Sequence, residues 1–231
     1  SMSIPQQAVN LNVTGLLNVL ESARKHGVKK LCLASSAAVY GESPIQPKVE
    51  TMTPDPRSPY AITKLDGEYY CGLYQREGWL ATACLRFFNV YGPRQDPHSP
   101  YSGVISIFAA LVAADRTVTV HGDGAQLRDF VYVGDVIVHL LASMRHLATN
   151  RVAAVLNVCT GRATSISALA ETLARLHQRA ARITHGPARA GDIRRSLGDP
   201  ARATATLAVR AEVTLEQGLA RTLATPQPAT A

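Results

Sequence analysis

The amino-acid sequence predicts an α/β protein built on a doubly wound parallel sheet. In the first half of the chain, helical segments over 8–26 and 60–77 alternate with apolar strand segments over 29–35 and 81–88. The strand segments are short and continuously apolar, as in strands that are buried on both faces. Alternation of helices with such strands is typical of a parallel sheet that helices cover on both sides.

The first of these strands ends in two hydroxyl side chains. Leu31-Cys32-Leu33-Ala34 is followed directly by Ser35 and Ser36. Open α/β sheets bind their ligands at the carboxyl ends of the strands. We therefore expect Ser35 and Ser36 to lie at a ligand site, ahead of a proline-rich loop over 42–57 that cannot be regular structure.

A tyrosine and a lysine open the next helix. Ser58 can cap this helix and Pro59 can occupy its first turn, so that Tyr60 and Lys64 share one helical face. A phenol is a poor base at neutral pH, but a neighbouring ammonium favours its ionised form. Tyr60 is therefore a candidate base. An ordinary amphipathic helix can also contain this spacing, so the interpretation depends on the serine-ended strand upstream.

The second half of the chain continues the mixed pattern less regularly. Gly122-Asp123-Gly124 superficially resembles a phosphate-binding glycine motif, but no helix follows it at the right place, which favours a hairpin or a turn. The other segments that we expect are helices over 103–114, 136–147 and 164–178, strands over 118–121 and 154–159, a final helix containing 215–219, and a disordered tail from 224.

Composition narrows the class of protein. The chain has 231 residues, of which 46% are hydrophobic and 18% charged, as in globular proteins. No apolar run reaches the roughly eighteen residues of a membrane span, and the first ten residues do not resemble a signal peptide. The four cysteines lack metal-ligand spacing, which favours buried thiols, no metal site and a cytoplasmic location. The net charge of +7 is spread along the chain, which favours a small anionic ligand over nucleic acid.

Three motifs in a fixed order identify a family. They are Ser-Ser-x-x-Val-Tyr-Gly over 35–41, Ser-Pro-Tyr-x-x-x-Lys over 58–64 and Arg-Phe-Phe-Asn-Val-Tyr-Gly-Pro-Arg over 86–94. Together they resemble the extended short-chain dehydrogenase/reductases, in particular the NAD-dependent UDP-glucose and UDP-N-acetylglucosamine 4-epimerases. The resemblance runs from about residue 10 to about residue 222.

The resemblance implies a division of the chain into two regions. It assigns residues 1–91 and 135–162 to an incomplete Rossmann-like dinucleotide-binding domain. Residues 92–134 and 163–223 would form a smaller, mixed α/β substrate-binding region, followed by the tail over 224–231. The family also suggests a homodimer in which the helices over 8–26 and 60–77 join those of a second copy in a four-helix bundle.

The resemblance also implies a reaction and its residues. NAD would take hydride from C4 of the sugar while Tyr60 removes the hydroxyl proton, with Lys64 as its charge partner and Ser36 as hydrogen-bond donor or relay. Asn12 belongs to Asn12-Val13-Thr14-Gly15, which resembles the family's Asn-Val-x-Gly. The residues that would contact NAD are Asn12, Ser35, Tyr60, Lys64 and Phe87.

The substrate residues follow from two further blocks. Residues 128–135 resemble the family's Arg-Asp-Phe-x-x-Val-x-Asp, and residues 189–199 resemble its Arg-x-Gly-Asp segment. Ser196 aligns with a position where these epimerases carry either a bulky tyrosine or a small residue, so the resemblance favours a pocket with room for an N-acetyl group. The less favoured alternative is that Ser196 is only a polar strand residue. The residues that would contact the UDP-sugar are Ser36, Asn89, Arg128, Arg189, Asp192 and Ser196.

One departure from the family keeps a second interpretation open. No Gly-x-x-Gly-x-x-Gly precedes the strand over 29–35, and on the order of 60 to 90 residues of the family's pattern are absent. We expect weak NAD binding, and an open strand edge with uncovered apolar helix faces that favours association or altered packing. The alternative to an epimerase is a non-catalytic remnant that binds sugar nucleotides. A 4,6-dehydratase is disfavoured because Ala37-Ala38 stands where dehydratases carry Asp-Glu.

Overall fold

A parallel sheet forms the larger half of the protein. The computed structural model describes residue 2 and residues 4–96, 103–188 and 192–224. The sheet has the order β1-β2-β6, and both pairings are parallel. Its strands are β1 (Lys30–Ser36), β2 (Ala81–Phe87) and β6 (Ala153–Val158). Each lies within one or two residues of the segment expected from the sequence.

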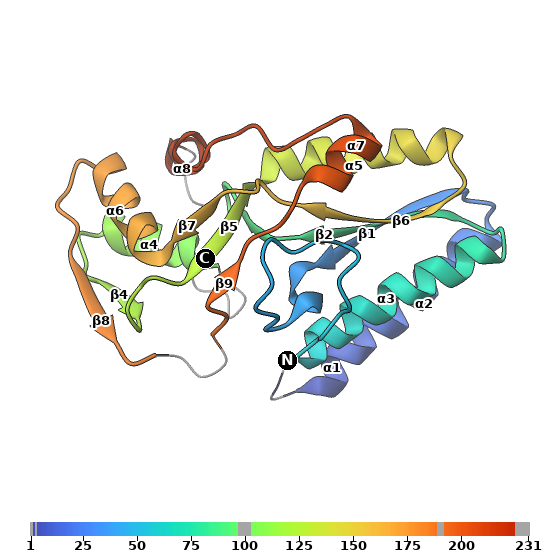
Figure 1. Cartoon of the computed structure of the whole chain (residues 1–231), viewed down its shortest axis with the longest axis horizontal. Helices are drawn as coiled ribbons and strands as arrows, with labels where there is room; N and C mark the ends of the chain where they lie inside the picture. The colour runs from blue at the N-terminus through green and yellow to red at the C-terminus, as the bar shows by residue number, and fades with distance from the viewer. Residues whose placement is uncertain (1, 3, 97–102, 189–191, 225–231) are drawn as a thin grey trace.

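Helices cover both faces of this sheet, as a doubly wound fold requires. In Figure 1, α2 and α3 lie on one face, whereas α5 and α7 lie on the other. The bounds of these helices are α2 (Gly15–Lys25), α3 (Pro59–Arg76), α5 (Val133–Thr149) and α7 (Ala201–Leu207). The predicted α/β class and its Rossmann-like arrangement are thereby confirmed.

The first helical segment is longer and less regular than its spacing predicts. It begins with α1 (Pro5–Val9), passes through a π-helical turn, η1 (Asn10–Thr14), and continues into α2. A π-helical turn inserts an extra residue into the helix, and such turns are frequent at functional sites. This turn places Asn12 against α3, as described below.

Apolar side chains pack the helices onto the two faces. On one face, Leu20 of α2 and Cys71 of α3 pack with Cys84 of β2. On the other face, Leu85 and Leu156 of the sheet pack with residues of α5. The cysteines are free thiols, and Cys71, Cys84 and Cys159 are buried, which confirms the prediction of buried thiols.

Short strands build the second region. In it β3 (Asn89–Tyr91) pairs in parallel with β5 (Leu127–Tyr132), and β7 (Ala163–Ser165) pairs with β5 in antiparallel direction. A two-residue strand, β9 (Arg195–Ser196), also pairs with β5. Because β3 follows β2 after a single residue, this region joins the carboxyl end of the larger sheet directly.

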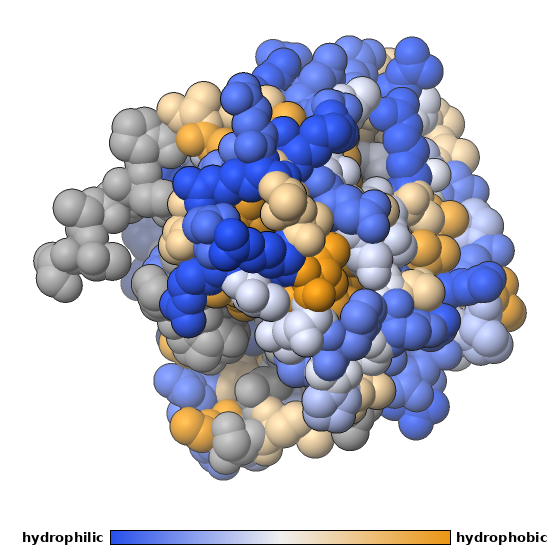
Figure 2. All heavy atoms as spheres, turned by 90° about the vertical axis from the view of Figure 1, so that its left-hand side faces the viewer, coloured by the Kyte–Doolittle hydropathy of each residue, from blue (hydrophilic) through white to orange (hydrophobic). Residues whose placement is uncertain are grey.

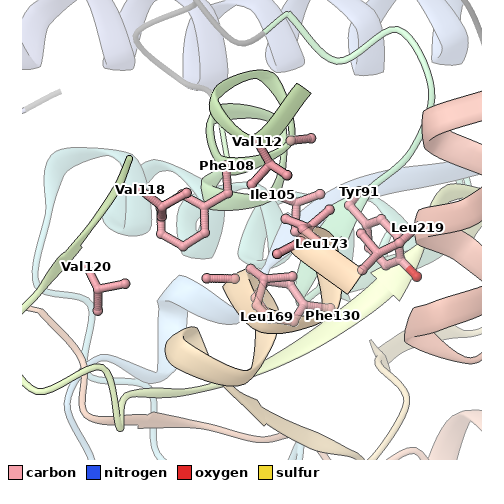
Figure 3. Packing of buried hydrophobic residues seen from close by; sticks show 13 residues of the cluster. Tyr91, Ile105, Phe108, Val112, Val118, Val120, Phe130, Leu169, Leu173 and Leu219 are labelled. Carbon is pink, nitrogen blue, oxygen red and sulfur yellow. The ribbon is translucent and has the colours of Figure 1, made fainter. Parts of the chain in front are cut away.

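A separate core stabilises the second region. Figure 3 shows Phe108, Leu169 and Leu173 packed around Tyr91 and Phe130 of the short strands. The helices that supply this core are α4 (Val104–Ala113), α6 (Ile166–Leu176) and α8 (Leu215–Ala224). The boundaries between the two regions expected from the sequence stay a prediction, and the tail over 225–231 lies outside the described residues.

The glycine-rich segment is a turn and not a hairpin. The strand before it, β4 (Val118–His121), pairs in parallel with the distant β8 (Ile183–Gly186) and does not pair with β5. Gly122 and Gly124 have φ values of +72° and +73°, which side chains with a Cβ rarely adopt. The hairpin alternative is therefore wrong, and the turn is confirmed.

The end of the molecule that carries α4, α6 and β8 is shown in Figure 2. Hydrophilic residues there are interleaved with small apolar patches. Within the described ranges, no helix combines the length and the apolar character that a membrane span needs.

Candidate active site

The candidate site starts where β1 ends. Ser36, the last residue of β1, accepts a hydrogen bond from the backbone N–H of Ala38 at 3.2 Å and so caps the 3-10 turn η2 (Ala37–Tyr40). The proline-rich loop then returns the chain to the start of α3. There Ser58 Oγ accepts from the N–H of Ala61 at 3.2 Å, with Pro59 in the first turn, which confirms the predicted cap.

Tyr60 and Lys64 lie together on α3 beside this end of β1. The Lys64 Nζ atom is 5.6 Å from the centre of the Tyr60 ring and donates to the carbonyl oxygen of Ala34 at 2.9 Å. Tyr60 is 39% exposed, so a ligand can reach its hydroxyl. Burial lowers the pKa of the Lys64 ammonium. A partly desolvated ammonium in this position can stabilise negative charge on a neighbouring oxygen.

Two of the expected cofactor residues come to the same place. Asn12 Nδ2 donates to Thr63 Oγ1 at 3.0 Å, and Thr63 Oγ1 in turn donates to the carbonyl oxygen of Tyr60 at 2.9 Å. Phe87 ends β2 and stands opposite Ser36 in the parallel register. Asn12, Tyr60 and Lys64 are thus connected through the first turns of α3, and Phe87 lies beside Ser36.

Ser35 is held differently from the other predicted residues. Its side chain is 3% exposed, and its hydroxyl donates to Glu68 Oε1 at 2.5 Å. The Ser35 hydroxyl therefore links β1 to α3 through a hydrogen bond. A contact of Ser35 with a cofactor would have to come from its backbone.

A cavity of about 250 Å³ lies in the second region, and its lining does not include Ser36, Tyr60 or Lys64. It brings together three of the expected substrate residues, Asn89, Arg128 and Asp192. Asn89 lies two residues after Phe87, at the start of β3, and its Nδ2 donates to the carbonyl oxygen of Asp129 at 3.2 Å. The remaining lining is Val104, Ile107, Phe108, His121, Gln126 and Ile166. A cavity with apolar walls and a few polar groups is typical of small-molecule sites.

Arg128 is the main charged group of this cavity. Its Nη2 pairs with Asp192 Oδ1 at 2.5 Å, and its Nη1 donates to the carbonyl oxygen of Ile193 at 2.6 Å. Burial lowers the pKa of the Arg128 guanidinium, and Asp192 acts in the opposite direction. Ser196 stands opposite Arg128 in the pairing of β9 with β5. Arg189 lies outside the described residues.

Asp129 is a residue of this region to which the sequence analysis gave no role. Its buried carboxylate accepts from the N–H and the hydroxyl of Thr160, at 2.8 and 2.7 Å, and from the N–H of Gly161 at 2.9 Å. It also accepts from the N–H of Gly198, two residues after Ser196. Burial raises the pKa of Asp129. A charged residue inside an apolar strand was the available signal, and its role is to hold the segment that carries Ser196.

The residues at the end of β1 fit one half of a dinucleotide. An ammonium has three protons to donate, and among the described residues Lys64 uses one on Ala34, which leaves donors for ribose hydroxyls. The phenol of Tyr60 and the amide of Asn12 are also polar groups suited to a ribose. The printed sequence before β1 holds no glycine-rich turn for the pyrophosphate. The fit therefore covers the nicotinamide-ribose end.

Comparison with known proteins assigns the family. Residues 1–159 match the model of the NAD dependent epimerase/dehydratase family. The chain belongs to this family. The match confirms the resemblance drawn from the three motifs, the enzyme class and NAD as the cofactor of the family.

Relatives of the family cover nearly the whole chain. The UDP-glucose 4-epimerase of Mycolicibacterium smegmatis is 37% identical over 224 residues, which are 96% of this chain and 70% of the relative. Among solved structures, the UDP-N-acetylglucosamine 4-epimerase of Methanobrevibacter ruminantium, solved with UDP-N-acetylmuramic acid, has a TM-score of 0.91 at 30% identity. The UDP-glucose 4-epimerase of Thermotoga maritima, solved with UDP-glucose, has a TM-score of 0.90 at 36% identity. Both alignments cover 96% of this chain and 71% of the solved one.

Proposed function

We propose that this member of the epimerase/dehydratase family is a nucleotide-sugar 4-epimerase that acts on a UDP-sugar of the UDP-N-acetylglucosamine or UDP-glucose type. The main support is that the Tyr60–Lys64 pair of α3 is tied to β1 through Ala34, two residues before Ser36 ends that strand, while Arg128 lines the cavity of the second region. These elements supply a base, a hydroxyl and an anion-binding group for one substrate.

The side chains divide the reaction between them. The Tyr60 oxygen would take the proton of the C4 hydroxyl, and the Ser36 hydroxyl would hydrogen-bond the same substrate oxygen. Lys64 would stabilise the charge on Tyr60 and hold the ribose of the cofactor. Lys64, Tyr60 and Asn12 would hold the nicotinamide end of NAD, which would supply the hydride chemistry at C4 of the sugar. The proton then returns from Tyr60, so that epimerisation needs no further acid.

The cavity residues would hold the rest of the substrate. The fork of Arg128 suits a diphosphate, because guanidinium groups bind phosphate oxygens in bidentate fashion. Asn89 and Arg189 would assist at the diphosphate. Asp192 and Ser196 would line the sugar pocket, as the family resemblance implies.

Two positions favour epimerisation over related reactions. Ala37 and Ala38 directly follow Ser36 and form the turn η2. Dehydratases need a carboxylate pair at these positions, and related decarboxylases keep a glutamate at the second. Neither side chain can therefore supply the acid that water elimination or decarboxylation needs.

Ser196 bears on the choice of sugar. Ser196 pairs with Arg128 in the register of β9 and β5, although it is not part of the cavity lining. By the family resemblance, a small side chain at this position leaves room for an N-acetyl group. We therefore favour UDP-N-acetylglucosamine over UDP-glucose. The M. ruminantium relative is named for this substrate, and the T. maritima relative for the other.

A binding module is the second candidate. Its support is that the cavity with Arg128 and Asp192 is built entirely from residues of the second region and does not include Tyr60 or Lys64. A chain that keeps the sugar-nucleotide cavity without retaining NAD would bind UDP-sugars without turning them over.

The two candidates differ in one assay. The protein is incubated with NAD and either UDP-N-acetylglucosamine or UDP-glucose, and C4 epimers are separated by chromatography. Tyr60→Phe should reduce turnover by about 10²- to 10⁴-fold, the usual contribution of a general base. Tyr70→Phe is the matched control, because Tyr70 lies on the same helix and belongs neither to the candidate site nor to the side chains assigned to the dimer. UDP-sugar binding without turnover would favour the binding module, and a 4-keto-6-deoxy product would favour a dehydratase.

We also propose that the protein is a homodimer, as the family suggests. Val19 of α2 and Tyr69 and Leu73 of α3 are apolar side chains that are 41% to 63% exposed in the single chain. Burial of these side chains in a four-helix bundle would remove apolar surface from water. Light scattering on the purified protein tests the mass. The cytoplasmic location stays a prediction.

A further inference from the structure

A buried ion pair joins β2 to α3, the helix that carries Tyr60 and Lys64. Arg86 of β2 binds Glu68 of α3 in bidentate fashion, with Nε to Oε1 at 2.9 Å and Nη2 to Oε2 at 2.7 Å. Both side chains are only 4% exposed. Removing two charges from water is costly, and well-packed apolar residues of similar size often stabilise a fold equally well. Stability alone is therefore a weak reason for this pair.

The pair is connected to the strand that carries Ser36. Ser35 donates its hydroxyl to the same Glu68 oxygen that accepts from Arg86 Nε. One residue before Ser35, the carbonyl oxygen of Ala34 accepts from Lys64. Glu68 lies one helical turn after Lys64 and two turns after Tyr60, on the same helix. These contacts determine how β1 sits against α3, and therefore how far Ser36 lies from Tyr60.

A second connection reaches the turn on the other side of Ser36. The Arg86 guanidinium carbon lies 4.8 Å from the centre of the Tyr40 ring, a distance typical of a cation–π contact. Tyr40 ends the turn η2, and its hydroxyl donates to Asn157 Oδ1 of β6 at 2.7 Å. Both Tyr40 and Asn157 are fully or almost fully buried. Glu68 thus holds the chain at Ser35, directly before Ser36, and Arg86 contacts it at Tyr40, four residues after Ser36.

We infer that Glu68 is a positioning residue, which together with Arg86 holds the Ser36 hydroxyl of β1 at the working distance from Tyr60 and Lys64 of α3. Glu68 is not exposed toward a ligand and would touch neither the substrate nor NAD. Because Ser36 and Tyr60 come from different elements, their separation depends on the packing between those elements. A displacement of about 1 Å between reacting groups can reduce the rate on the order of 10²-fold. This role rests on the proposed function.

The test needs variants that keep the fold. Glu68→Met combined with Arg86→Met removes both charges and leaves apolar side chains of similar length, so that no uncompensated charge stays buried. Ser35→Ala removes only the hydroxyl that joins β1 to Glu68. Ser143→Ala is the matched control, because Ser143 is equally buried and its hydroxyl has no hydrogen-bond partner among the residues that the structure describes.

The first readout is hydrogen exchange, which needs neither substrate nor turnover. Peptides covering 33–41 and 59–65 should exchange roughly tenfold faster in Ser35→Ala and in the double variant, as for the loss of one net hydrogen bond. A peptide over 166–176, from α6, should exchange as in the parent protein. Unchanged exchange at 33–41 would overturn the inference. Equal acceleration at α6 would overturn it too, because it would indicate a loss of stability throughout the fold.

The second readout separates this inference from the proposed function. In a protein that turns over UDP-N-acetylglucosamine, both variants should lower kcat by about ten- to hundredfold and leave KM nearly unchanged, because the substrate cavity is intact. A rise in KM with unchanged kcat would contradict a positioning role. If the parent protein has no turnover, the proposed function fails, and the exchange result still decides whether Glu68 positions Ser36.

Discussion

Arg128 is the residue on which sugar-nucleotide binding should depend most. It is half of an ion pair with Asp192 and the main cation of the cavity. We predict that Arg128→Ala weakens the binding of UDP-N-acetylglucosamine by about ten- to hundredfold, because charge-assisted hydrogen bonds to phosphate are lost. Calorimetry measures this. Arg145→Ala, at an exposed site on α5, is the control. Equal affinity of the Arg128 variant and the parent protein would place the diphosphate elsewhere.

The turn after β4 contains the clearest pH-dependent group. Arg194 binds Asp123 at 2.6 and 2.8 Å, and this contact, with help from the N–H of Ala125, lowers the pKa of Asp123 to about 2. Because this pKa lies below that of the unfolded chain, near 3.9, the contact stabilises the fold above about pH 4. That contribution is lost as the pH falls toward 2.

This gives a prediction for a single carboxyl group. Arg194→Ala should raise the pKa of Asp123 toward its ordinary value, since Arg194 is the largest cause of the shift. Titration of the carboxyl carbons by NMR follows the change. Arg182→Ala, which removes a partner of Asp115, should leave Asp123 unaffected. An Asp123 pKa that stays near 2 without Arg194 would show that the turn backbone is sufficient.

The positions of site residues could be predicted from the sequence where a local motif determines them. They could not be predicted where the packing of distant elements determines them. Tyr60 and Lys64 lie together on α3 because their spacing and the Ser58 cap follow from local helix geometry. The hydroxyl of Ser35, expected at the cofactor, is instead used by Glu68. That contact depends on how α3 lies across β1, which no local pattern specifies. The charged Arg86 within an apolar strand was the one signal of the buried pair.

At the scale of elements, two glycines on helices test how packing limits side-chain size. A Cβ at Gly218 of α8 would lie 2.0 Å from the hydroxyl of Tyr91, whose ring is buried in the core. A Cβ at Gly72 of α3 would meet only the end of the Arg76 side chain, at 3.7 Å. The two positions therefore differ in available space and share the helical backbone.

We predict opposite effects of alanine at these two positions. Gly218→Ala should lower the free energy of unfolding by roughly 1–3 kcal/mol through overpacking against Tyr91. Gly72→Ala should raise it by about 0.5–1 kcal/mol, because alanine loses less backbone freedom on folding. Urea denaturation measures both. A stabilising Gly218→Ala would mean that α8 moves away from Tyr91 at little cost.

Elements were predictable in proportion to their length and regularity. The strands β1, β2, β4 and β6 and the helix α3 were located from apolar runs, caps and glycines within one or two residues. The short strands β3, β7 and β9 carry too few residues to show an alternation, and they exist because β5 pairs with them. The pairing of β4 with β8 joins segments more than sixty residues apart in the sequence. Such pairing is decided by the folded chain and not by a turn.

At the scale of the whole molecule, the described residues offer more contacts to the substrate than to the cofactor. The substrate side is built from β3, β5, β9 and their connections, all within the second region and its own core. The cofactor side stands at β1, which is an outer strand of its sheet, paired on one side with β2. The residues around β1 suit the nicotinamide ribose, and the described residues before β1 include no glycine-rich turn that could hold the pyrophosphate.

We therefore predict that this chain binds UDP-N-acetylglucosamine more tightly than NAD. Arg128 would supply charge-assisted hydrogen bonds to the diphosphate, each contributing about 1.5–3 kcal/mol. Among the described residues around β1, the candidate contacts to NAD are Lys64, Tyr60 and Asn12, which suit its nicotinamide ribose and not its pyrophosphate. Calorimetry with each ligand alone gives the two dissociation constants, and Lys64→Met should weaken only the binding of NAD. Tight binding of NAD by this chain would contradict the prediction, because it would require a pyrophosphate site that the residues around β1 do not provide.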